Sequence, residues 1–295
     1  MLDGPQEAPG PGKSNSLMTL LDVLRSTTAY FEKRDIESAR LNAEHLLAHV
    51  LGRKRIELYL EFERPLGETE LAPLRELVRR RGQGEPLQHL LGTAEFFDRI
   101  FLCDRRALVP RPETEELVEK LAAMKWPGGA RFLDVGTGSG VIALTLAAHF
   151  LEAELHAVDI SDDALALARE NAERLDLQGR VHFAKSNLLA EVEGRFDLIV
   201  ANLPYVAIGE RPSLSREVLH DPEVAVFAGV RGDELVRELI SAAPDRLRPG
   251  GMLALEVGIG QADDLASFQA DKNYHDIASI RDYCGVKRFL FGRYG

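Results

Sequence analysis

The sequence is poor in the features that build disulfide frameworks, metal sites and membrane spans. Its two cysteines, Cys103 and Cys284, lie far apart in the chain, and their positions match no metal-ligand or disulfide spacing. It also lacks the run of about 18 apolar residues that a transmembrane helix needs. We therefore expect a cytoplasmic protein in a reducing compartment, with no bound metal and no membrane contact.

Positive charge is also in deficit. The 295 residues include 36 Lys and Arg against 47 Asp and Glu, which gives a formal net charge of −11. Phosphate binding needs clustered basic side chains, so we expect no direct binding of nucleic acid. The one obvious basic run, residues 79–81, is interpreted as a solvated helix end. With 45% hydrophobic and 28% charged residues, the composition is that of a soluble globular protein.

The chain divides into four segments by texture. Residues 1–16 are rich in Pro and Gly and predict a disordered tail, not a signal peptide. Apolar residues at helical spacing predict a helical domain over residues 17–87, with helices near 17–24, 39–50, 54–60 and 71–78. Residues 88–110 predict a β-hairpin linker that turns at Asp98-Arg99.

Residues 111–295 alternate between strand and helix patterns. Apolar runs predict strands at 131–135, 155–158, 181–184, 196–201 and 252–257. Helical patterns separate them at 113–124, 141–150, 162–175 and 233–247. Such alternation is typical of an α/β fold with a mostly parallel sheet and helices on both faces. Two further runs, 277–281 and 287–291, predict a closing antiparallel pair.

A glycine-rich loop joins the first of these strands to its helix. Its residues are Asp134, Gly136, Thr137, Gly138, Ser139 and Gly140. A loop of this kind alone is also consistent with a plain tight turn or a dinucleotide site. However, the spacing is Gly-x-Gly-x-Gly, which is not the dinucleotide pattern. The acid before it repels a pyrophosphate and suits the ammonium of a methionine moiety. We therefore favour S-adenosylmethionine as the ligand.

Four later residues complete the predicted donor site: Asp159, Asn187, Leu188 and Asn202. Asp159 ends the next strand, where a carboxylate is placed to accept hydrogen bonds from a ribose diol. Asn187 and Leu188 follow the third strand, where the amide suits the adenine amino group and the leucine suits its face. An ordinary polar loop is an equally good interpretation of Asn187 and Leu188.

The stretch Asn202-Leu203-Pro204-Tyr205 follows the fourth strand. A primary amide nitrogen is a poor nucleophile because its lone pair is delocalised. The Asn202 side-chain oxygen and the Leu203 carbonyl are candidates to accept hydrogen bonds from its two N–H groups. These hydrogen bonds would localise the nitrogen lone pair. Tyr205 offers a face for a planar group, and catalysis is then mainly positioning. An isolated motif of this kind is more often a plain loop, but its place after a strand of this fold favours a site.

These motifs together resemble those of the release factor glutamine methyltransferases, the HemK-type protein N5-glutamine methyltransferases. The resemblance covers about residues 18–295 and includes Gly84–His89, Gly92, Glu95-Phe96, Leu108–Glu115, Glu217, Asp221-Pro222, Gly232, Pro249–Gly251 and Glu256. It implies a Rossmann-like class I S-adenosylmethionine-dependent methyltransferase fold with an N-terminal helical domain and a β-hairpin linker.

The same resemblance implies a reaction and a partner. Members methylate the glutamine of the Gly-Gly-Gln motif in class I peptide chain release factors, which tunes translation termination and leaves S-adenosyl-L-homocysteine. The N-terminal helices would help to hold the release factor, and Asn202–Tyr205 would bind the glutamine. Arg111 and Pro112, in the linker signature, are expected to join this substrate site.

Leu203 departs from the family pattern, which usually has proline there. The expected contact is a backbone carbonyl, which leucine keeps, and Leu203 still precedes a proline and is held extended. However, Asn-Leu-Pro-Tyr is also the form in rRNA adenine dimethylases, so an adenine N6-methyltransferase acting on RNA or DNA is the main alternative. A non-catalytic S-adenosylmethionine-binding scaffold is the other. The acidic charge and the linker signature favour a protein glutamine.

Overall fold

The computed structural model of the chain describes residues 18–295. The tail predicted over residues 1–16 lies outside this range. The fold separates into two compact units, one ending at Gly84 and the other covering Glu85–Gly295. Among the described residues, every helix is too short or too polar to cross a membrane.

The first unit is helical, as predicted. Its helices are α1 (Leu20–Glu32), α2 (Ala39–Leu51), α3 (Arg55–Leu58) and α4 (Glu68–Gly82). Thr19 starts α1 with a capping box, in which its hydroxyl accepts from Asp22 N and the Asp22 carboxylate accepts from Thr19 N. Gly52 ends α2 in a left-handed conformation that costs glycine little. From the predicted stripes, Leu20, Ala43, Leu46 and Leu47 are fully buried.

The second unit begins with a short helix and a hairpin. Helix α5 (Leu87–Leu91) was not predicted, because five residues carry no helical period. Strands β1 (Thr93–Phe96) and β2 (Arg99–Leu102) form the predicted antiparallel hairpin. Its turn is Phe97-Asp98, not Asp98-Arg99 as expected: both turn residues have positive φ, and Arg99 already pairs with Phe96.

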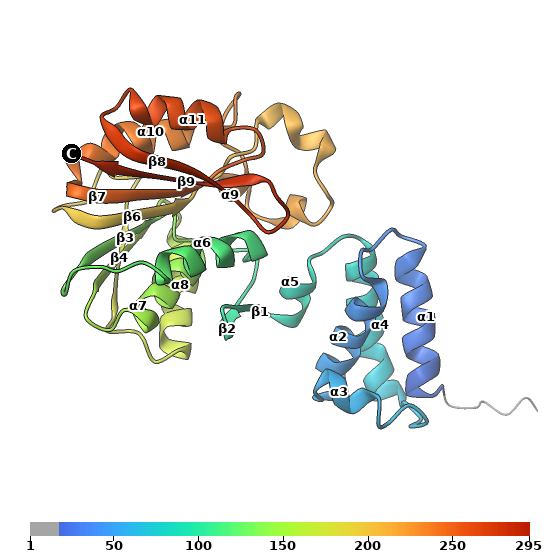
Figure 1. Ribbon diagram of the computed structural model, residues 1–295. Helices are drawn as coiled ribbons and strands as arrows, with labels where there is room; N and C mark the ends of the chain where they lie inside the picture. The colour runs from blue at the N-terminus through green and yellow to red at the C-terminus, as the bar shows by residue number, and fades with distance from the viewer. Residues whose placement is uncertain (1–17) are drawn as a thin grey trace, which may run out of the picture. The chain divides into compact units, whose positions relative to one another are not determined.

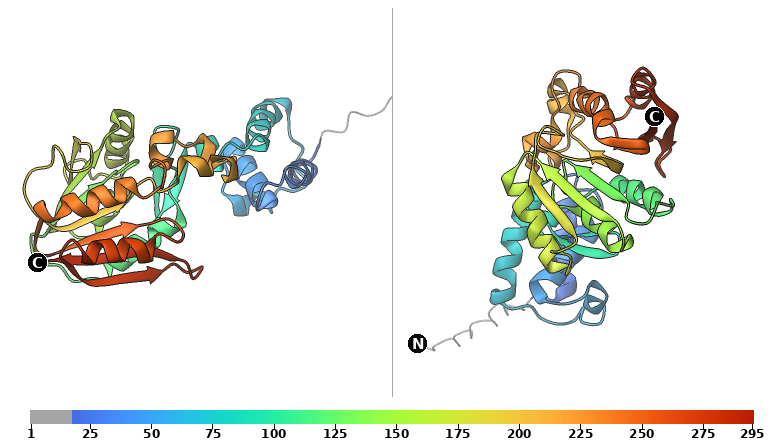
Figure 2. Two further views of the ribbon diagram at one scale, coloured as in Figure 1. Left: turned by 90° about the horizontal axis from the view of Figure 1, so that it is seen from above. Right: turned by 90° about the vertical axis from the view of Figure 1, so that its left-hand side faces the viewer.

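A seven-stranded sheet forms the centre of the second unit (Figure 1, Figure 2). Its strands are β3 (Arg131–Val135), β4 (Glu154–Asp159), β5 (Val181–Lys185), β6 (Phe196–Asn202), β7 (Leu247–Glu256), β8 (Tyr274–Arg281) and β9 (Lys287–Tyr294). Their order is β5-β4-β3-β6-β7-β9-β8. Strand β9 runs antiparallel to both β7 and β8, and all other pairs are parallel. The predicted mostly parallel sheet with a closing antiparallel pair is confirmed.

Helices cover both faces of this sheet (Figure 1). One face packs against α6 (Pro112–Ala122), α7 (Val141–His149) and α8 (Asp162–Arg174), and the other against α10 (Glu234–Ala242) and α11 (Ala262–Ala270). Neighbouring residues alternate between the two cores: Phe132 joins the first and Leu133 the second. Central strands buried on both faces read as unbroken apolar runs, which explains why they were predicted well.

Two boundaries near the C-terminus differ from expectation. The helix predicted over 233–247 ends at Ala242, and a 3-10 turn, Ala243–Asp245, follows it around Pro244. Strand β7 begins at Leu247, earlier than the predicted residue 252, and its pairing with β6 shifts register between Phe196 and Leu198. Helix α11 was not predicted. The segment between β6 and α10 holds short turns only: Ile208–Ser213, Val218–His220 and α9 (Glu223–Val226).

Candidate active site

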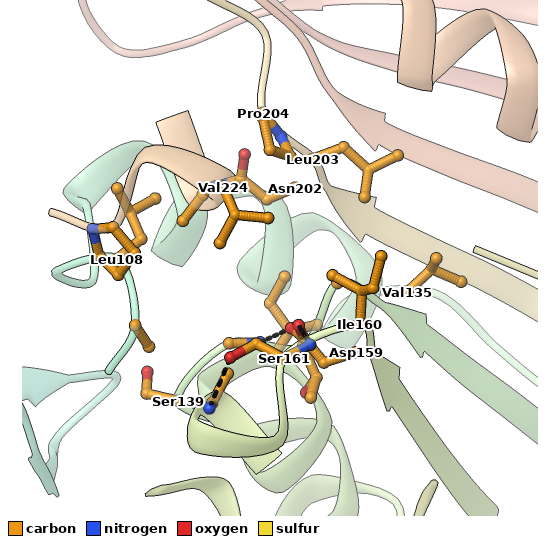
Figure 3. A pocket seen from close by; sticks show the side chains of 18 of the residues that line it. Leu108, Val135, Ser139, Asp159, Ile160, Ser161, Asn202, Leu203, Pro204 and Val224 are labelled. Carbon is orange, nitrogen blue, oxygen red and sulfur yellow. Dashed lines mark hydrogen bonds between the residues drawn. The ribbon is translucent and has the colours of Figure 1, made fainter. Parts of the chain in front are cut away.

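The carboxyl ends of the parallel strands meet at one edge of the sheet. The chain moves from β3 outward to β4 and β5, then returns to place β6 on the other side of β3. In open α/β sheets ligands bind at such a switch point. A cavity of about 230 Å³ lies there. Figure 3 shows Asn202, Leu203 and Pro204 on one side of it, and Asp159, Ile160 and Ser161 on the opposite side.

Most of the residues predicted for the site line this cavity. They are Arg111, Gly136, Thr137, Gly138, Ser139, Asp159, Asn187, Leu188, Asn202, Leu203 and Pro204. Gly140 instead forms the N-cap of α7, and Pro112 is the first residue of α6. Tyr205 lines a second cavity next to the first. Asp134 lies below the glycine-rich loop.

Hydrogen bonds hold the glycine-rich loop against the end of β4. Gly136 N and Thr137 N both donate to Val158 O, at 2.8 and 3.0 Å, and Gly138 N donates to Asp159 Oδ2 at 2.9 Å. Gly136 has φ +72°, and a Cβ on it would lie 2.8 Å from Leu203 Cδ2. The backbone conformation therefore favours glycine at this position, and a Cβ there would also displace the Leu203 side chain.

Asp134 supports the loop from inside. Its side chain is almost fully buried, and Oδ2 accepts from Thr137 Oγ1 at 2.7 Å and from Ala143 N at 3.2 Å. Burial raises its pKa to about 7. Asp134 is absent from the residues that line the cavity, which does not fit a carboxylate facing the ligand. The expected contact with a methionine ammonium therefore stays a prediction, and the visible role of Asp134 is to hold the loop.

Asp159 faces the cavity and is held at both oxygens. Besides the bond from Gly138, its Oδ1 accepts from Ser161 N at 2.9 Å. Ser161 in turn caps α8, its Oγ accepting from Ala164 N at 3.2 Å. Ile160, between the two, is half exposed and lines the cavity. Sequence reasoning missed Ile160 and Ser161, although an apolar residue exposed directly after a strand-ending acid is a usable signal.

An ion pair between the partly exposed Arg111 and the buried Asp221 joins the linker to the segment after β6. Asp221 Oδ1 accepts from Val109 N at 3.1 Å, and Oδ2 accepts from Arg111 Nη2 at 2.5 Å. Burial raises the pKa of Asp221. These bonds bring residues 106–111 next to Pro222, Val224 and Ala225, and both segments line the first cavity. The sequence marks Asp221 only as part of the family pattern, since nothing in its local sequence identifies a partner so far away in the chain.

The second cavity, of about 300 Å³, adjoins the first. It contains Tyr205, whose pKa burial raises to about 12, so its phenol stays neutral. Further lining comes from Val206, Leu214, Val218, Ile259, Gln261 and Arg288. The two cavities share Leu108, Arg111, Asn202, Leu203, Pro204 and Ala225. The stretch Asn202–Pro204 therefore lies where the two cavities meet.

The chain beyond Tyr205 is fixed by close packing. Gln261 Nε2 donates to Tyr205 O at 3.0 Å. A Cβ on Gly232 would lie 2.7 Å from Tyr205 O and 2.8 Å from Ala207 N, so only glycine fits there. These contacts fix the backbone on the C-terminal side of Pro204.

A chain of hydrogen bonds leads from Asn202 into the protein interior. Asn202 Nδ2 donates to Thr114 Oγ1 at 2.9 Å, and Thr114 Oγ1 donates to Glu256 Oε2 at 2.7 Å. Asn202 and Glu256 pair across β6 and β7, and α6 brings Thr114 alongside. Glu256 is almost fully buried, which raises its pKa to about 7. Sequence reasoning placed Thr114 and Glu256 only in the family pattern and gave them no role.

This arrangement suits a nucleoside with an attached amino acid. The glycine loop allows close approach of a ligand to the backbone, Asp159 presents a carboxylate, and Val135, Ile142, Ile160 and Leu188 form apolar walls. Residues 18–295 contain no group of three or more His, Cys, Asp or Glu side chains arranged to hold a metal ion. The glycine loop, the Asp159 carboxylate and the apolar walls are residues that fit S-adenosylmethionine in the first cavity.

Comparisons with known proteins decide the family. Residues 22–92 match the PrmC N-terminal domain, and residues 112–225 match the methyltransferase small domain. A release factor glutamine methyltransferase of Geobacter sulfurreducens is 39% identical over 281 residues, which covers 95% of this chain and 98% of that protein. One from Koribacter versatilis is 40% identical over 281 residues, covering 94% and 99%. The chain belongs to the release factor glutamine methyltransferase family.

Solved structures agree with this family at the level of the fold. A methyltransferase from Pyrococcus furiosus has a TM-score of 0.50 and 24% identity, covering 66% of this chain and 88% of its own. The hMettl16 catalytic domain, in complex with the MAT2A 3'UTR hairpin 6, has a TM-score of 0.55 and 15% identity, covering 77% and 82%. At such identities the likeness shows a shared class I methyltransferase fold alone. For this release factor glutamine methyltransferase family member, the acceptor has to be argued from the site.

Proposed function

We propose that this enzyme transfers a methyl group from S-adenosylmethionine to the side-chain amide nitrogen, N5, of the glutamine in the Gly-Gly-Gln motif of class I peptide chain release factors. The observation that carries this proposal is that the two cavities share lining residues. Asn202, Leu203 and Pro204 line both, so a donor in one and an acceptor in the other meet at these residues. Relatives at 39% and 40% identity over nearly the whole chain are named release factor glutamine methyltransferases.

In the first cavity we assign donor binding to the loop Gly136–Gly140, with Thr137 and Ser139, and to Asp159. The Asp159 carboxylate is held by two backbone N–H groups, so it is oriented before the donor arrives. Asn187 and Leu188 are assigned to the adenine, with Ile160 on the same wall. When bound, the donor supplies a methyl group activated by a sulfonium.

In the second cavity we assign amide binding to Asn202–Tyr205. Asn202 Oδ1 and the Leu203 carbonyl accept hydrogen bonds from the two N–H groups of the glutamine amide. These hydrogen bonds localise the nitrogen lone pair. That pair forms the new N–C bond while the methyl–sulfur bond breaks and leaves its electrons on sulfur, and the nitrogen then loses a proton to water. No general base is required, so catalysis is mainly positioning.

Arg111 has two assigned roles. Its guanidinium is paired with the buried Asp221, which ties the linker over the site, and the residue also lines both cavities. We place Arg111 at the edge of the substrate site, whereas Pro112 contributes by starting α6 next to it. The N-terminal helices are assigned to holding the release factor, and a cytosolic translation factor as substrate implies a cytoplasmic enzyme.

An adenine N6-methyltransferase is the rival, because an exocyclic amine presents similar N–H bonds. The test offers both acceptors at once: labelled donor is incubated with the enzyme, a class I release factor and rRNA, and the label is then mapped. We expect label on the release factor and none on RNA. Label on adenine, with none on the glutamine, would overturn the proposal.

A variant separates catalysis from mere donor binding. Asn202→Ala removes one acceptor for the amide but leaves the glycine loop and Asp159 in place. We expect methyl transfer to be lost while the donor affinity changes by less than about threefold. The substitution removes one polar contact, and this contact lies where the two cavities meet. A protein that bound donor and transferred to no partner would instead be a scaffold. Unchanged rate and affinity in the variant would exclude the role given to Asn202.

A further inference from the structure

We propose that Thr114 and Glu256 are positioning residues that fix the Asn202 amide with its NH₂ turned inward and its carbonyl oxygen turned to the acceptor. This inference rests on the proposed function, because it concerns the orientation of the amide that meets the glutamine. It follows from how many protons each group in the chain Asn202–Thr114–Glu256 can donate.

The polarity of this chain is set at its buried end. When Glu256 is ionised, its carboxylate only accepts hydrogen bonds, so Oε2 receives the hydroxyl proton of Thr114. A threonine hydroxyl has one proton, so once it is donated its oxygen can only accept. The group of Asn202 that faces Thr114 must therefore be the NH₂, and Oδ1 is left on the other side of the amide. Without this constraint, the two ends of an asparagine amide are nearly the same size and either could face the cavity.

This orientation matters for selecting the acceptor. A glutamine amide offers two N–H donors and needs acceptors, which are the Asn202 oxygen and the Leu203 carbonyl. A glutamate carboxylate offers no donor, so the same two oxygens repel it. A reversed Asn202 would present its NH₂ to the acceptor. It would then no longer accept a hydrogen bond from glutamine, and it would no longer repel glutamate.

The protonation of Glu256 controls the direction of the chain. A protonated Glu256 can donate to Thr114, which then donates to Asn202 Oδ1 and draws the oxygen away from the acceptor. The groups that face Glu256 act in opposite directions: Glu113 on α6 disfavours its charge, whereas Arg288 on β9 and the bonds from Thr114 and Asn202 favour it. Tyr205 is also within electrostatic range and stays neutral.

The test compares three threonine variants. Thr114→Val keeps the shape and removes the hydroxyl, Thr114→Ser keeps the hydroxyl, and Thr145→Val is a matched control. Thr145 lies in α7, is fully buried, and its hydroxyl has no partner among residues 18–295, so valine there removes no hydrogen bond. Single-turnover transfer to the release factor should fall about tenfold or more in Thr114→Val and stay within about threefold in the other two.

Binding gives a readout that does not depend on transfer. Titration calorimetry compares a release factor carrying glutamine with one carrying glutamate at the methylated position. We expect wild type to prefer glutamine by about tenfold or more, and Thr114→Val to bring the two affinities within about threefold, with unchanged affinity for S-adenosyl-L-homocysteine. The rate of wild type should rise between pH 6 and 8 as Glu256, with a pKa of about 7, ionises. Glu256→Gln, which keeps Asp134 with its similar pKa, should show a clearly smaller rise.

Two failures can be told apart. A wild-type enzyme that leaves the glutamine unmethylated contradicts the proposed function itself. A wild-type enzyme that methylates it, with Thr114→Val showing the same rate and the same preference for glutamine, contradicts only the positioning role. Equal loss in Thr114→Val, Thr114→Ser and Thr145→Val would also contradict it, because a general packing defect and not the hydroxyl would then be responsible.

Discussion

At the scale of single residues, the packing of Leu203 against Gly136 explains why a leucine fits at this position. Its side chain is buried in the core on one face of the sheet, and its Cδ2 occupies the space that a Cβ on Gly136 would need. The residue that departs from the usual proline therefore packs against the first glycine of the donor loop. Its backbone carbonyl remains available to the acceptor, because only the side chain is engaged in this packing.

Gly136→Ala should weaken donor binding. The new methyl group would meet Leu203 Cδ2 at 2.8 Å, and alanine is strained at φ +72°. We expect the loop and Leu203 to shift into the cavity and the affinity for S-adenosylmethionine to fall about tenfold or more, in line with a strain of roughly 1 to 2 kcal/mol. Gly179→Ala, where the added Cβ meets nothing within 4 Å, is the control. Equal donor affinity in both variants, measured by calorimetry, would show that the Leu203 side chain moves aside without weakening donor binding.

Glu256 should make the folded state less stable as pH rises. Its folded pKa is raised from 4.5 to about 7, so between these values the unfolded chain releases a proton that the native state keeps. The stability contributed by the protonated group is complete below the unfolded pKa and is lost as pH rises through the folded pKa. Glu256→Gln lacks this effect. The stability of the variant relative to wild type should therefore be greater at pH 8 than at pH 5 by roughly 1 to 3 kcal/mol.

Urea unfolding at the two pH values measures this difference. Asp134, whose pKa burial also raises to about 7, is present in both proteins and cancels from the comparison. A variant that differs from wild type by the same free energy at pH 5 and pH 8 would show that Glu256 is ionised throughout. In that case, the pH dependence expected for transfer would also disappear.

At the scale of elements, Asn171 links three parts of the second unit. Its side chain, fully buried on α8, accepts from Leu102 N at 2.6 Å and donates to Leu102 O at 3.2 Å and to Ser139 O at 2.9 Å. One amide thus joins the hairpin strand β2 to the glycine-rich loop. The hairpin is therefore part of the support of the donor site as well as a linker in sequence.

Asn171→Ala should loosen this link. It leaves the backbone groups of Leu102 and Ser139 without partners, which costs roughly 2 to 4 kcal/mol in total. We expect a lower melting temperature and faster hydrogen exchange at residues 99–102. Glu173→Ala, an exposed position on the same helix, is the matched control and should leave both unchanged. Unaltered exchange in the Asn171 variant would mean that the Asn171 amide is not needed to hold β2.

The elements that the sequence predicted are those with a strong period or a continuous core run. The buried strands around Phe132, Leu155 and Leu198, and the helix around Leu165, have such patterns. Helix α11 was missed because Ala262, Leu265 and Gln269 are its buried residues, and two of these three are small or polar. The turns between β6 and α10 carry no period at all. They line both cavities through long-range pairs such as Asp221 with Arg111, which one sequence does not reveal.

The same limit explains the site. Loop glycines, Asp159 and Asn202–Tyr205 were found because each directly follows a predicted strand, and parallel strands end at one edge. Asp134 was expected to face the ligand because its charge suits an ammonium, but burial below the loop depends on packing that spacing does not specify. Thr114 became part of the Asn202 network only when α6 was placed against β6 and β7.

At the scale of the whole molecule, the labour is divided between the two units. All residues that line the two cavities belong to the unit Glu85–Gly295. The helical unit contributes none of them, so we assign it to holding the protein substrate. The net charge of −11 is consistent with a protein acceptor, because a surface of this charge repels free nucleic acid.

A fragment starting at Glu85 should separate these tasks. We expect its affinity for S-adenosylmethionine to stay within about threefold of the full chain, since no donor contact is removed, while KM for the release factor rises about tenfold or more. Steady-state kinetics and calorimetry measure the two quantities. A fragment with an unchanged KM would show that the unit Glu85–Gly295 recognises the release factor without the helical unit.

The central claim is that the acceptor is one amide nitrogen on a protein. The most direct test is fragmentation mass spectrometry of a class I release factor after incubation with the enzyme and S-adenosylmethionine. The account predicts a single added methyl group, located on the side-chain nitrogen of the glutamine in Gly-Gly-Gln and absent when that glutamine is replaced by alanine. A methyl group on another residue, or on an adenine of RNA present in the same reaction with the glutamine unmodified, would contradict it.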